Sequence, residues 1–215
     1  MIAYASNTGT LRNVDAIRKA GWRVLLTPKD LGRRPHSGIP FALDNGAWTA
    51  FQQKRPFDDA RFLRLVESHG AMADFVIVPD IVAGGTKSLD FSLSWIPRLR
   101  HLRRLLLPLQ DGMTVERISD VLRDHPRLGL FLGSSTEWKL KTMYSWGVVA
   151  CASRRYYHVG RVNTMRRIRL AAEAGADSFD GTSVSMYAIT LPLLDAARRQ
   201  PSLLVPSTGC CERCL

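Results

Sequence analysis

The chain has 215 residues, of which 46% are hydrophobic and 23% are charged. This is enough for one sizeable hydrophobic core and little more, so we expect a single main domain. No apolar run approaches the length of a membrane span, and the first ten residues, MIAYASNTGT, lack the charged and apolar regions of a signal peptide. We therefore expect a cytoplasmic protein that does not contact a membrane.

The formal net charge is +11, and 24 arginines stand against six lysines. Arginine forms planar, bidentate contacts with phosphate that lysine cannot form. The basic residues are clustered, for example at Arg33 and Arg34 and at Arg154 and Arg155. We expect a polyanionic partner, nucleic acid first. The alternative is a genomic bias toward arginine codons that leaves these charges simply solvated. The charge pattern indicates nothing about the oligomeric state.

Short apolar runs alternate with amphipathic stretches along the chain. In chain order we predict a strand over 1–6, a helix over 11–21, strands over 22–27 and 40–44, a helix over 58–70, strands over 74–80 and 104–110, a helix over 114–125, strands over 128–133 and 156–160, a helix over 163–175, a strand over 177–180 and a helix over 186–200. The segment between the second and third strands leaves no room for a helix, because Pro35, Gly38 and Pro40 interrupt it.

Eight strands with intervening helices indicate a compact single-domain (β/α)8 TIM barrel over residues 1–200, or else a large doubly wound sheet. Such barrels usually need about 250 residues, so this one would be small. Residues 201–215 read as a separate C-terminal tail that contains cysteines.

Several of the apolar runs stop abruptly at a polar residue. These residues are Asp44, Asp80, Gln110 with Asp111, Ser134 and Asp180. In parallel α/β folds the carboxyl ends of the strands face one way, and ligands bind there. A single aspartate at such a place is most often a helix cap or a turn former. A recurring set predicts a shared site.

The motifs around these residues are DNGAW (44–48), VIVPDIV (76–82), LQDG (109–112), GLFLGSSTEWK (129–139) and GADSFDGTS (175–183). In this order they resemble motifs of the tRNA-guanine transglycosylases and of their DNA-directed relatives, the 7-deazaguanine DNA transglycosylases. Members of this family fold as (β/α)8 barrels and cut a base–sugar N-glycosidic bond with an aspartate nucleophile. The resemblance therefore implies the same fold and chemistry here.

The resemblance implies two catalytic residues. Asp180 in GADSFDGTS takes the place of the nucleophile, and a carboxylate at a strand end is free to attack an anomeric carbon and form a covalent ester. Asp44 takes the place of the family's aspartate that handles protons and orients the sugar. The alternative for Asp180 is a cap before residues 181–183, and Asp177 is expected to be structural.

The resemblance also implies a base pocket. Trp48 would stack on the base, although an ordinary core tryptophan is the alternative reading, and Asp80 would read the N–H donors of a purine edge. The other residues placed in the pocket are Gln110, Gly133, Ser134 and Gly160. Ile81 and Asp111 depart from the family's pattern, so the recognised base need not be guanine.

Arg161 follows Gly160 and has no equivalent in the family. At the mouth of a barrel an arginine suits a phosphate. We expect Arg161 to bind phosphate, together with the two clusters Arg33, Arg34 and Arg154, Arg155.

The tail contains Cys210, Cys211 and Cys214. Three thiolates and a histidine such as His158 could bind zinc, and the family's tRNA enzymes carry a zinc subdomain that helps dock tRNA. The spacing here is wrong and no histidine follows, so we expect free thiols, with Cys151 alone, and no cofactor or metal. The loss of that subdomain favours DNA over tRNA as the partner.

The sequence thus predicts a glycosylase that removes a specific base, modified or not, from DNA. Such an activity would suit defence against foreign DNA. One alternative is a transglycosylase that exchanges (7-deaza)guanine in DNA or tRNA, and a second is a non-catalytic barrel that binds nucleic acid. A metal-dependent barrel hydrolase would need several histidines at strand ends, where His158 is the only candidate.

Overall fold

The computed structural model of the chain describes residues 1–8, 10–32 and 38–200. Its strands are β1 (Ile2–Ser6), β2 (Arg23–Leu26), β3 (Phe41–Leu43), β4 (Val76–Ile77), β5 (Leu105–Leu109), β6 (Leu128–Leu132), β7 (Tyr157–Val159) and β8 (Ser178–Gly181). All neighbours are parallel and follow sequence order, and β8 pairs with β1, so the sheet closes into a barrel. The predicted (β/α)8 TIM barrel is confirmed.

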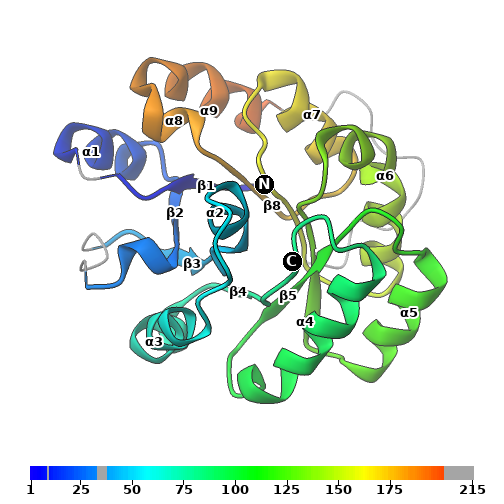
Figure 1. The fold of residues 1–215 in the computed structure, drawn as a ribbon. Coiled ribbons are helices and arrows are strands. Elements are labelled where there is room, and N and C mark those ends of the chain that lie inside the picture. The colour runs from blue at the N-terminus through cyan, green and yellow to red at the C-terminus, as the bar shows by residue number, and fades with distance from the viewer. Residues whose placement is uncertain (9, 33–37, 201–215) are drawn as a thin grey trace.

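The helices form an outer ring around the strands (Figure 1). They are α1 (Leu11–Lys19), α2 (Ala47–Gln52), α3 (Asp59–His69), α4 (Thr86–Leu99), α5 (Val115–Asp124), α6 (Thr136–Ala152), α7 (Met165–Glu173), α8 (Ser183–Met186) and α9 (Leu191–Arg199). The short α2 is the exception, because in Figure 1 it lies inside the ring, over the strands. In the described part of the chain, no helix is long and apolar enough to cross a membrane.

The predicted helices are present, but α2, α4, α6 and α8 were not predicted. In α6 the apolar side chains do not keep to one face, since Tyr144 and Val148 are more than half exposed while Trp146 and Val149 are buried. The helical periodicity is therefore weak in the sequence. The predicted helix over 186–200 is instead a 3-10 turn, Ala188–Thr190, followed by α9 with a proline in its first turn.

The helix starts follow simple capping chemistry. Asp58 and Thr114 cap α3 and α5 by accepting hydrogen bonds from backbone N–H groups three residues on, at 2.9 and 3.3 Å. Ser135 and Thr164 cap α6 and α7 in the same way. Because these helices run antiparallel to the strands, their N-terminal ends all lie at the carboxyl end of the barrel.

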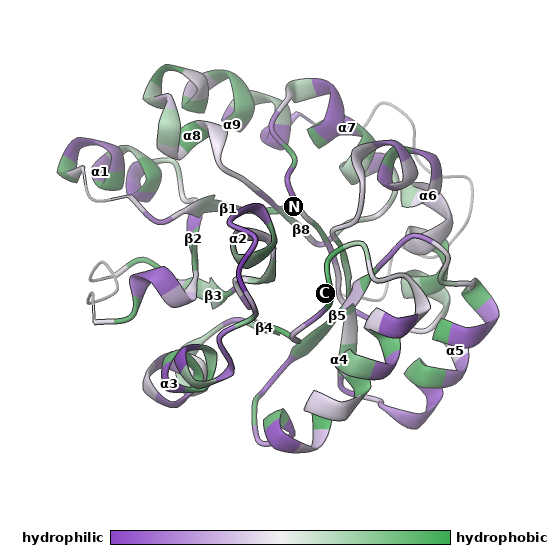
Figure 2. Cartoon of the chain, viewed as in Figure 1, coloured by the Kyte–Doolittle hydropathy of each residue, from purple (hydrophilic) through white to green (hydrophobic). Residues whose placement is uncertain are grey.

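Two apolar cores hold the barrel together. The barrel interior is filled by Tyr4, Leu25, Ala42, Phe75, Ile77 and Leu106, with Phe131 and Tyr156 packed against them. A larger core lies between the strands and the helices. In Figure 2 the strands are mostly hydrophobic, whereas the outer helices carry both hydrophobic and hydrophilic residues. The small interior residue Ala42 leaves room for the large rings of its neighbours.

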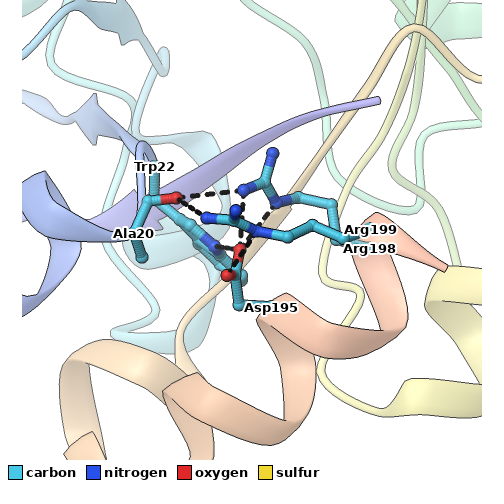
Figure 3. A network of polar contacts seen from close by, with 5 residues as sticks. All are labelled: Ala20, Trp22, Asp195, Arg198 and Arg199. Atoms are coloured by element: carbon cyan, nitrogen blue, oxygen red, sulfur yellow. Dashed lines mark hydrogen bonds and ion pairs between the residues drawn. The ribbon is translucent and has the colours of Figure 1, made fainter.

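The last helix is tied to the first part of the barrel by Asp195. Its carboxylate accepts a hydrogen bond from the Trp22 indole at 2.8 Å and pairs with Arg198 at 2.6 Å and Arg199 at 2.7 Å (Figure 3). Both arginines also donate to the carbonyl oxygen of Ala20 at 3.0 Å. Burial raises the pKa of Asp195, but the hydrogen bonds from Arg198 and Trp22 outweigh it, so the pKa lies below its ordinary value.

The cysteine expectation changes in one respect. Cys151 lies at the end of α6 and is disulfide-bonded, so the prediction of a lone thiol is wrong. Cys210, Cys211 and Cys214 lie outside the described residues.

Asp195→Asn should lower the free energy of unfolding at pH 7 by about 1–3 kcal/mol, because charge-assisted hydrogen bonds from two arginines are lost. The lowered pKa gives the sign of the pH dependence. The carboxylate stabilises the fold above the pKa of about 3.9 that an unfolded aspartate has, and this contribution is lost as the pH falls further. Urea unfolding of both proteins between pH 3 and pH 7 measures it.

Asp120→Asn is the matched control. Asp120 forms an i,i+3 pair with Arg123 at 3.0 Å, like Asp195 and Arg198, but both side chains are more than half exposed. Its loss should change the free energy of unfolding by less than about 0.5 kcal/mol. Equal losses in the two variants would show that Asp195 does not fasten the last helix.

Candidate active site at the barrel mouth

The two-residue period of the strands carries polar residues into the mouth of the barrel. Ala42 faces the interior, so Asp44 does so one step later, at the carboxyl end of β3. Leu106 on β5 also faces the interior, and Gln110 follows it by four residues, or two periods of the strand, so its side chain points inward as well. Asp180, two residues after Ser178, is the inward-facing residue of β8. The predicted site residues therefore converge because the strands are parallel.

Asp180 is held by two hydrogen-bond donors. Its Oδ2 lies 3.0 Å from Nε2 of His158, and its Oδ1 accepts the backbone N–H of Arg161 at 3.2 Å. Nδ1 of His158 in turn lies 2.7 Å from the hydroxyl oxygen of Ser178. A neutral imidazole with its proton on Nε2 satisfies both contacts, because Nδ1 then accepts from the serine hydroxyl. The carboxylate is 7% exposed, so its orientation is fixed by these partners.

His158 is fixed in place by aromatic rings. It is fully buried, and the Phe131 ring stacks on it with centroids 5.4 Å apart and planes inclined by 16°. Tyr4 and Phe75 contact the imidazole from other directions, at 5.8 and 5.1 Å between centroids. Such a cage allows little rotation of the imidazole, which therefore holds Asp180 in one position.

Asp80 is clamped by two amides. Its Oδ1 accepts from Nδ2 of Asn45 at 2.8 Å, and its Oδ2 accepts from Nε2 of Gln110 at 2.5 Å. Two backbone contacts fix Asn45 in turn. Its Nδ2 donates to the carbonyl oxygen of Val78, and its Oδ1 accepts the backbone N–H of Ala47. Burial raises the pKa of Asp80 to about 6, against the opposing effect of the two amides. The structure thus brings Asp80 and Gln110 together, as a shared base pocket requires.

Asp44 is the carboxyl group most disposed to carry a proton. Burial raises its pKa to about 7; the backbone N–H of Gly46 opposes this rise, while the charges of Asp180 and Asp80 add to it. That N–H donates to Oδ1 of Asp44 at 2.6 Å. A group with this pKa can both give and accept protons near neutral pH.

The two glycines of the predicted pocket are required by packing. A Cβ on Gly133 would lie 2.4 Å from the ring of Phe131. A Cβ on Gly160 would lie 2.7 Å from the same ring and 3.1 Å from a carboxylate oxygen of Asp180. Both glycines therefore let Phe131 stack on His158, which is a role that the sequence did not predict.

Arg161 lies across the mouth. Its guanidinium carbon is 4.2 Å from the ring centroid of Trp48 on α2, and its Nη2 donates to the carbonyl oxygens of Gly133 and Ser134. The ring of Trp48 is 40% exposed, so it is not the core tryptophan of the alternative reading. This contact ties α2, which follows β3, to the ends of β6 and β7.

Lys139 is a site residue that the sequence did not reveal. Its side chain on α6 is fully buried, and Nζ donates to the carbonyl oxygen of Gly160 at 2.5 Å. Burial and the nearby charge of Arg161 lower its pKa to about 8, against the attraction of Asp180. The lysine supports the backbone turn that presents the Arg161 N–H to Asp180.

Other predicted residues lie elsewhere. Arg154 and Arg155 precede β7, so they lie at the opposite end of the barrel from Asp180. Arg155 donates to the carbonyl oxygen of Leu122 at 2.9 Å and also to the carbonyl oxygen of Pro126. The structure thus does not bring this pair to the site.

Arg33 and Arg34 lie outside the described residues. Among the described residues, no group of three or more His, Cys, Asp or Glu side chains is placed to hold a metal ion. Asp177, expected to be structural, accepts the backbone N–H of Tyr157 at 2.7 Å.

Four contributors were missed or misjudged from the sequence: His158, Ser178, Asn45 and Lys139. The inward period of β7 and β8 was the available signal for His158 and Ser178, because both precede a predicted site residue by two positions. Nothing in the sequence distinguishes Lys139 from a solvated lysine. Neither known protein-family models nor curated proteins give a match to this chain.

Asp44→Asn should stabilise the protein at pH 8 but not at pH 4. The raised folded-state pKa of Asp44 means that its contribution to stability is full below the unfolded pKa of about 4 and is lost as the pH rises through 7. Asparagine has no charge to bury and can still accept from Gly46. We expect the variant to gain about 1–3 kcal/mol in the free energy of unfolding over this range, measured by urea unfolding at each pH.

Asp90→Asn, an exposed position on α4, is the control and should show no such gain. A stability difference between Asp44→Asn and the wild type that stays constant with pH would mean that the Asp44 carboxyl is not held in a desolvated site.

Proposed function

We propose that this protein cleaves the N-glycosidic bond of a specific base in DNA, with Asp180 as the nucleophile. The observation that carries the proposal is the buried Asp180 carboxylate, oriented by His158 and by a backbone N–H, within electrostatic reach of Asp44. Two carboxyl groups in environments of different polarity can divide the roles of nucleophile and proton carrier.

In the first step, an oxygen of Asp180 attacks C1′ of the sugar. A C1′–O ester bond forms, the C1′–N bond breaks, and its electron pair leaves with the base. Protonated Asp44, with a pKa of about 7, gives the proton that neutralises the departing base. The hydrogen bonds from His158 and the Arg161 N–H hold the attacking carboxylate in line.

In the second step, the ionised Asp44 takes a proton from water, and the water oxygen attacks C1′. The ester bond breaks and Asp180 is released as a carboxylate, which leaves an abasic sugar in the strand. Asp44 is protonated again, so the cycle closes without a further reactant. A raised pKa suits a group that must give a proton in one step and take one in the next.

Base recognition falls to Asp80 and Trp48. Each oxygen of Asp80 accepts one amide donor, and a carboxylate has further acceptor sites for the N–H groups of a base. The exposed Trp48 ring supplies a stacking surface. The Phe51 ring lies beside it, with the ring centroids 5.9 Å apart and the ring planes inclined by 27°.

The surroundings of the mouth suit a polyanion. A cavity of about 150 Å³ adjoins the Asn45–Gly46 turn and is lined on its far side by Lys29, Arg55 and Arg61. The capped helix starts also turn their positive ends toward this face. We place the phosphates that flank the extruded nucleotide here, since a base in duplex DNA must leave the stack to reach Asp180.

The leading alternative is base exchange, which uses the same covalent intermediate but lets a second base attack C1′ in place of water. The Asp80 clamp could hold such a base, so product analysis must distinguish the two. A non-catalytic nucleic-acid binder would have no use for carboxyl groups whose desolvation disfavours their charged form, and the raised pKa values of Asp44 and Asp80 argue against it.

Asp180→Asn should lower base release from DNA by at least about a thousandfold, because an amide oxygen is a poor nucleophile. Binding of DNA should persist. Released base and abasic sites are measured together on a panel of oligonucleotides with unmodified and modified bases. Asp177→Asn is the matched control, since Asp177 lies at the other end of β8 and asparagine can still accept from Tyr157. Equal activity in both variants would remove Asp180 from the mechanism.

Asp80→Asn should lower discrimination between bases, and Trp48→Ala should not. Asparagine replaces one acceptor oxygen with a donor, which leaves the N–H edge of the preferred base unpaired at a cost of about 1–3 kcal/mol, or roughly 10–100-fold in the ratio of kcat/KM values. Loss of the Trp48 ring weakens every base alike, because stacking ignores the hydrogen-bond pattern. A uniform loss in both variants would contradict the assignment of Asp80.

A further inference from the structure

Arg161 makes, in the free protein, contacts that a bound base would make. Its guanidinium carbon lies over the Trp48 ring, 4.2 Å from the ring centroid, on the face where a base would stack. Its Nη2 donates hydrogen bonds to the carbonyl oxygens of Gly133 and Ser134. A guanidinium and the N1–H and N2–H2 edge of guanine are both planar groups with adjacent N–H donors. The arginine thus occupies the position that the proposed function assigns to the target base.

The burial of the site supports this placement. Asn45, Gln110, Ser134 and Asp180 lie at the open end of a barrel, yet each is at most 9% exposed. In Figure 1 α2 lies over the strands, and the Arg161 guanidinium lies over the Trp48 ring of this helix. The positive charge also compensates three carboxyl groups, Asp44, Asp80 and Asp180, all of which attract it.

The backbone at Arg161 has an uncommon conformation, which Lys54, Ala83 and Arg154 share. Its φ is +55°, a left-handed conformation that costs a non-glycine residue about 1 kcal/mol or more. The same turn gives its N–H to Asp180 and its preceding carbonyl to Lys139. The backbone of Arg161 therefore contacts Asp180, while its side chain contacts Trp48 and the end of β6.

We propose that Arg161 makes the enzyme selective for a base attached to a phosphodiester backbone, because the arginine gives up the base position only in exchange for a phosphate. The inference rests on the proposed function and names its substrate class. A free nucleoside must displace Arg161 and offers the displaced guanidinium nothing. A nucleotide in a strand offers its neighbouring phosphates, which bind a guanidinium bidentately.

The surroundings favour the exchange. Arg167, on the first turns of α7, lies close enough to repel Arg161. A phosphate placed between these two arginines would relieve the repulsion and neutralise both charges. The N–H donors of the entering base take the place of the N–H donors of Arg161, and they then face Asp80 and the carbonyl oxygens of Gly133 and Ser134.

The test compares two ligands in four proteins. The ligands are 2′-fluoro-2′-deoxyguanosine and a single-stranded oligonucleotide that contains it, since 2′-fluorine slows glycosidic cleavage and keeps them intact. The proteins are the wild type, Arg161→Ala, Arg161→Lys and the control Arg166→Ala, which removes an exposed arginine from α7. Alanine has the same left-handed strain as arginine, so only the side chain changes. Affinities are measured by calorimetry and fluorescence anisotropy.

Arg161→Ala should bind the nucleoside at least about tenfold more tightly than the wild type, because the competing side chain is gone. The same variant should bind the oligonucleotide more weakly, with a salt dependence reduced by about one ion pair. Arg161→Lys should gain nucleoside affinity but keep most of the oligonucleotide affinity, since lysine keeps the positive charge but lacks the planar guanidinium that stacks on Trp48. Arg166→Ala should leave the nucleoside affinity unchanged.

Nucleoside affinity that is unchanged or lower in Arg161→Ala would overturn the proposal, and so would an absence of nucleoside binding in every variant. Base release from DNA is measured separately. If the wild type releases base while Arg161→Ala shows no gain, the enzyme assignment stands and the role of Arg161 falls. If no base is released but the opposite changes in affinity appear, the pocket and the role of Arg161 stand and the catalysis falls.

Discussion

The buried contact between Asp180 and His158 is the interaction on which the rest of the site depends. A carboxylate in a barrel interior is costly unless it is hydrogen-bonded, and the interior of this barrel supplies the bond through an imidazole locked by Phe131, Tyr4 and Phe75. The absence of side chains at Gly133 and Gly160 follows from the same requirement, since both make room for the Phe131 ring. The barrel core and the candidate nucleophile are therefore parts of one packing arrangement.

The second constraint is charge. Three carboxyl groups at one strand-end face repel each other, and the positive charge of Arg161 compensates this repulsion. This compensation requires a left-handed backbone conformation at Arg161 and places a cation in the proposed pocket. Strain and raised pKa values lower the stability of a fold, and they persist where function requires them. At the opposite end of the barrel, Asp74 pairs with Arg23 and accepts a hydrogen bond from Tyr4.

Much of this arrangement could be predicted from the sequence because parallel strands leave a regular signal. The apolar runs and their polar stops predicted the barrel and the convergence of Asp44, Asp80, Gln110 and Asp180. The side-chain network was not predictable in the same way. His158 reads as one more residue of a strand, and the burial of Lys139 depends on how α6 packs against the end of β7.

The arginine clusters show a further limit of the sequence. Arg155 was expected to bind phosphate, yet it donates to a backbone carbonyl oxygen within the fold, and Arg198 and Arg199 pair with Asp195. Arg161 was expected to bind phosphate and instead stacks on Trp48 in the free protein. A count of charges reports how many cations a chain has, whereas the tertiary contacts decide which of them remain for a partner.

The most direct measurement of the central claim is the capture of the covalent intermediate. An end-labelled oligonucleotide is mixed with the protein, the reaction is quenched in denaturant during turnover, and the protein–DNA adduct is digested and mapped by mass spectrometry. Because the ester joins C1′ of the strand to the protein, the account predicts a labelled adduct on the peptide that contains Asp180, and none in Asp180→Asn. An adduct on another residue, such as Lys139, or abasic sites that accumulate in Asp180→Asn at the wild-type rate, would contradict it.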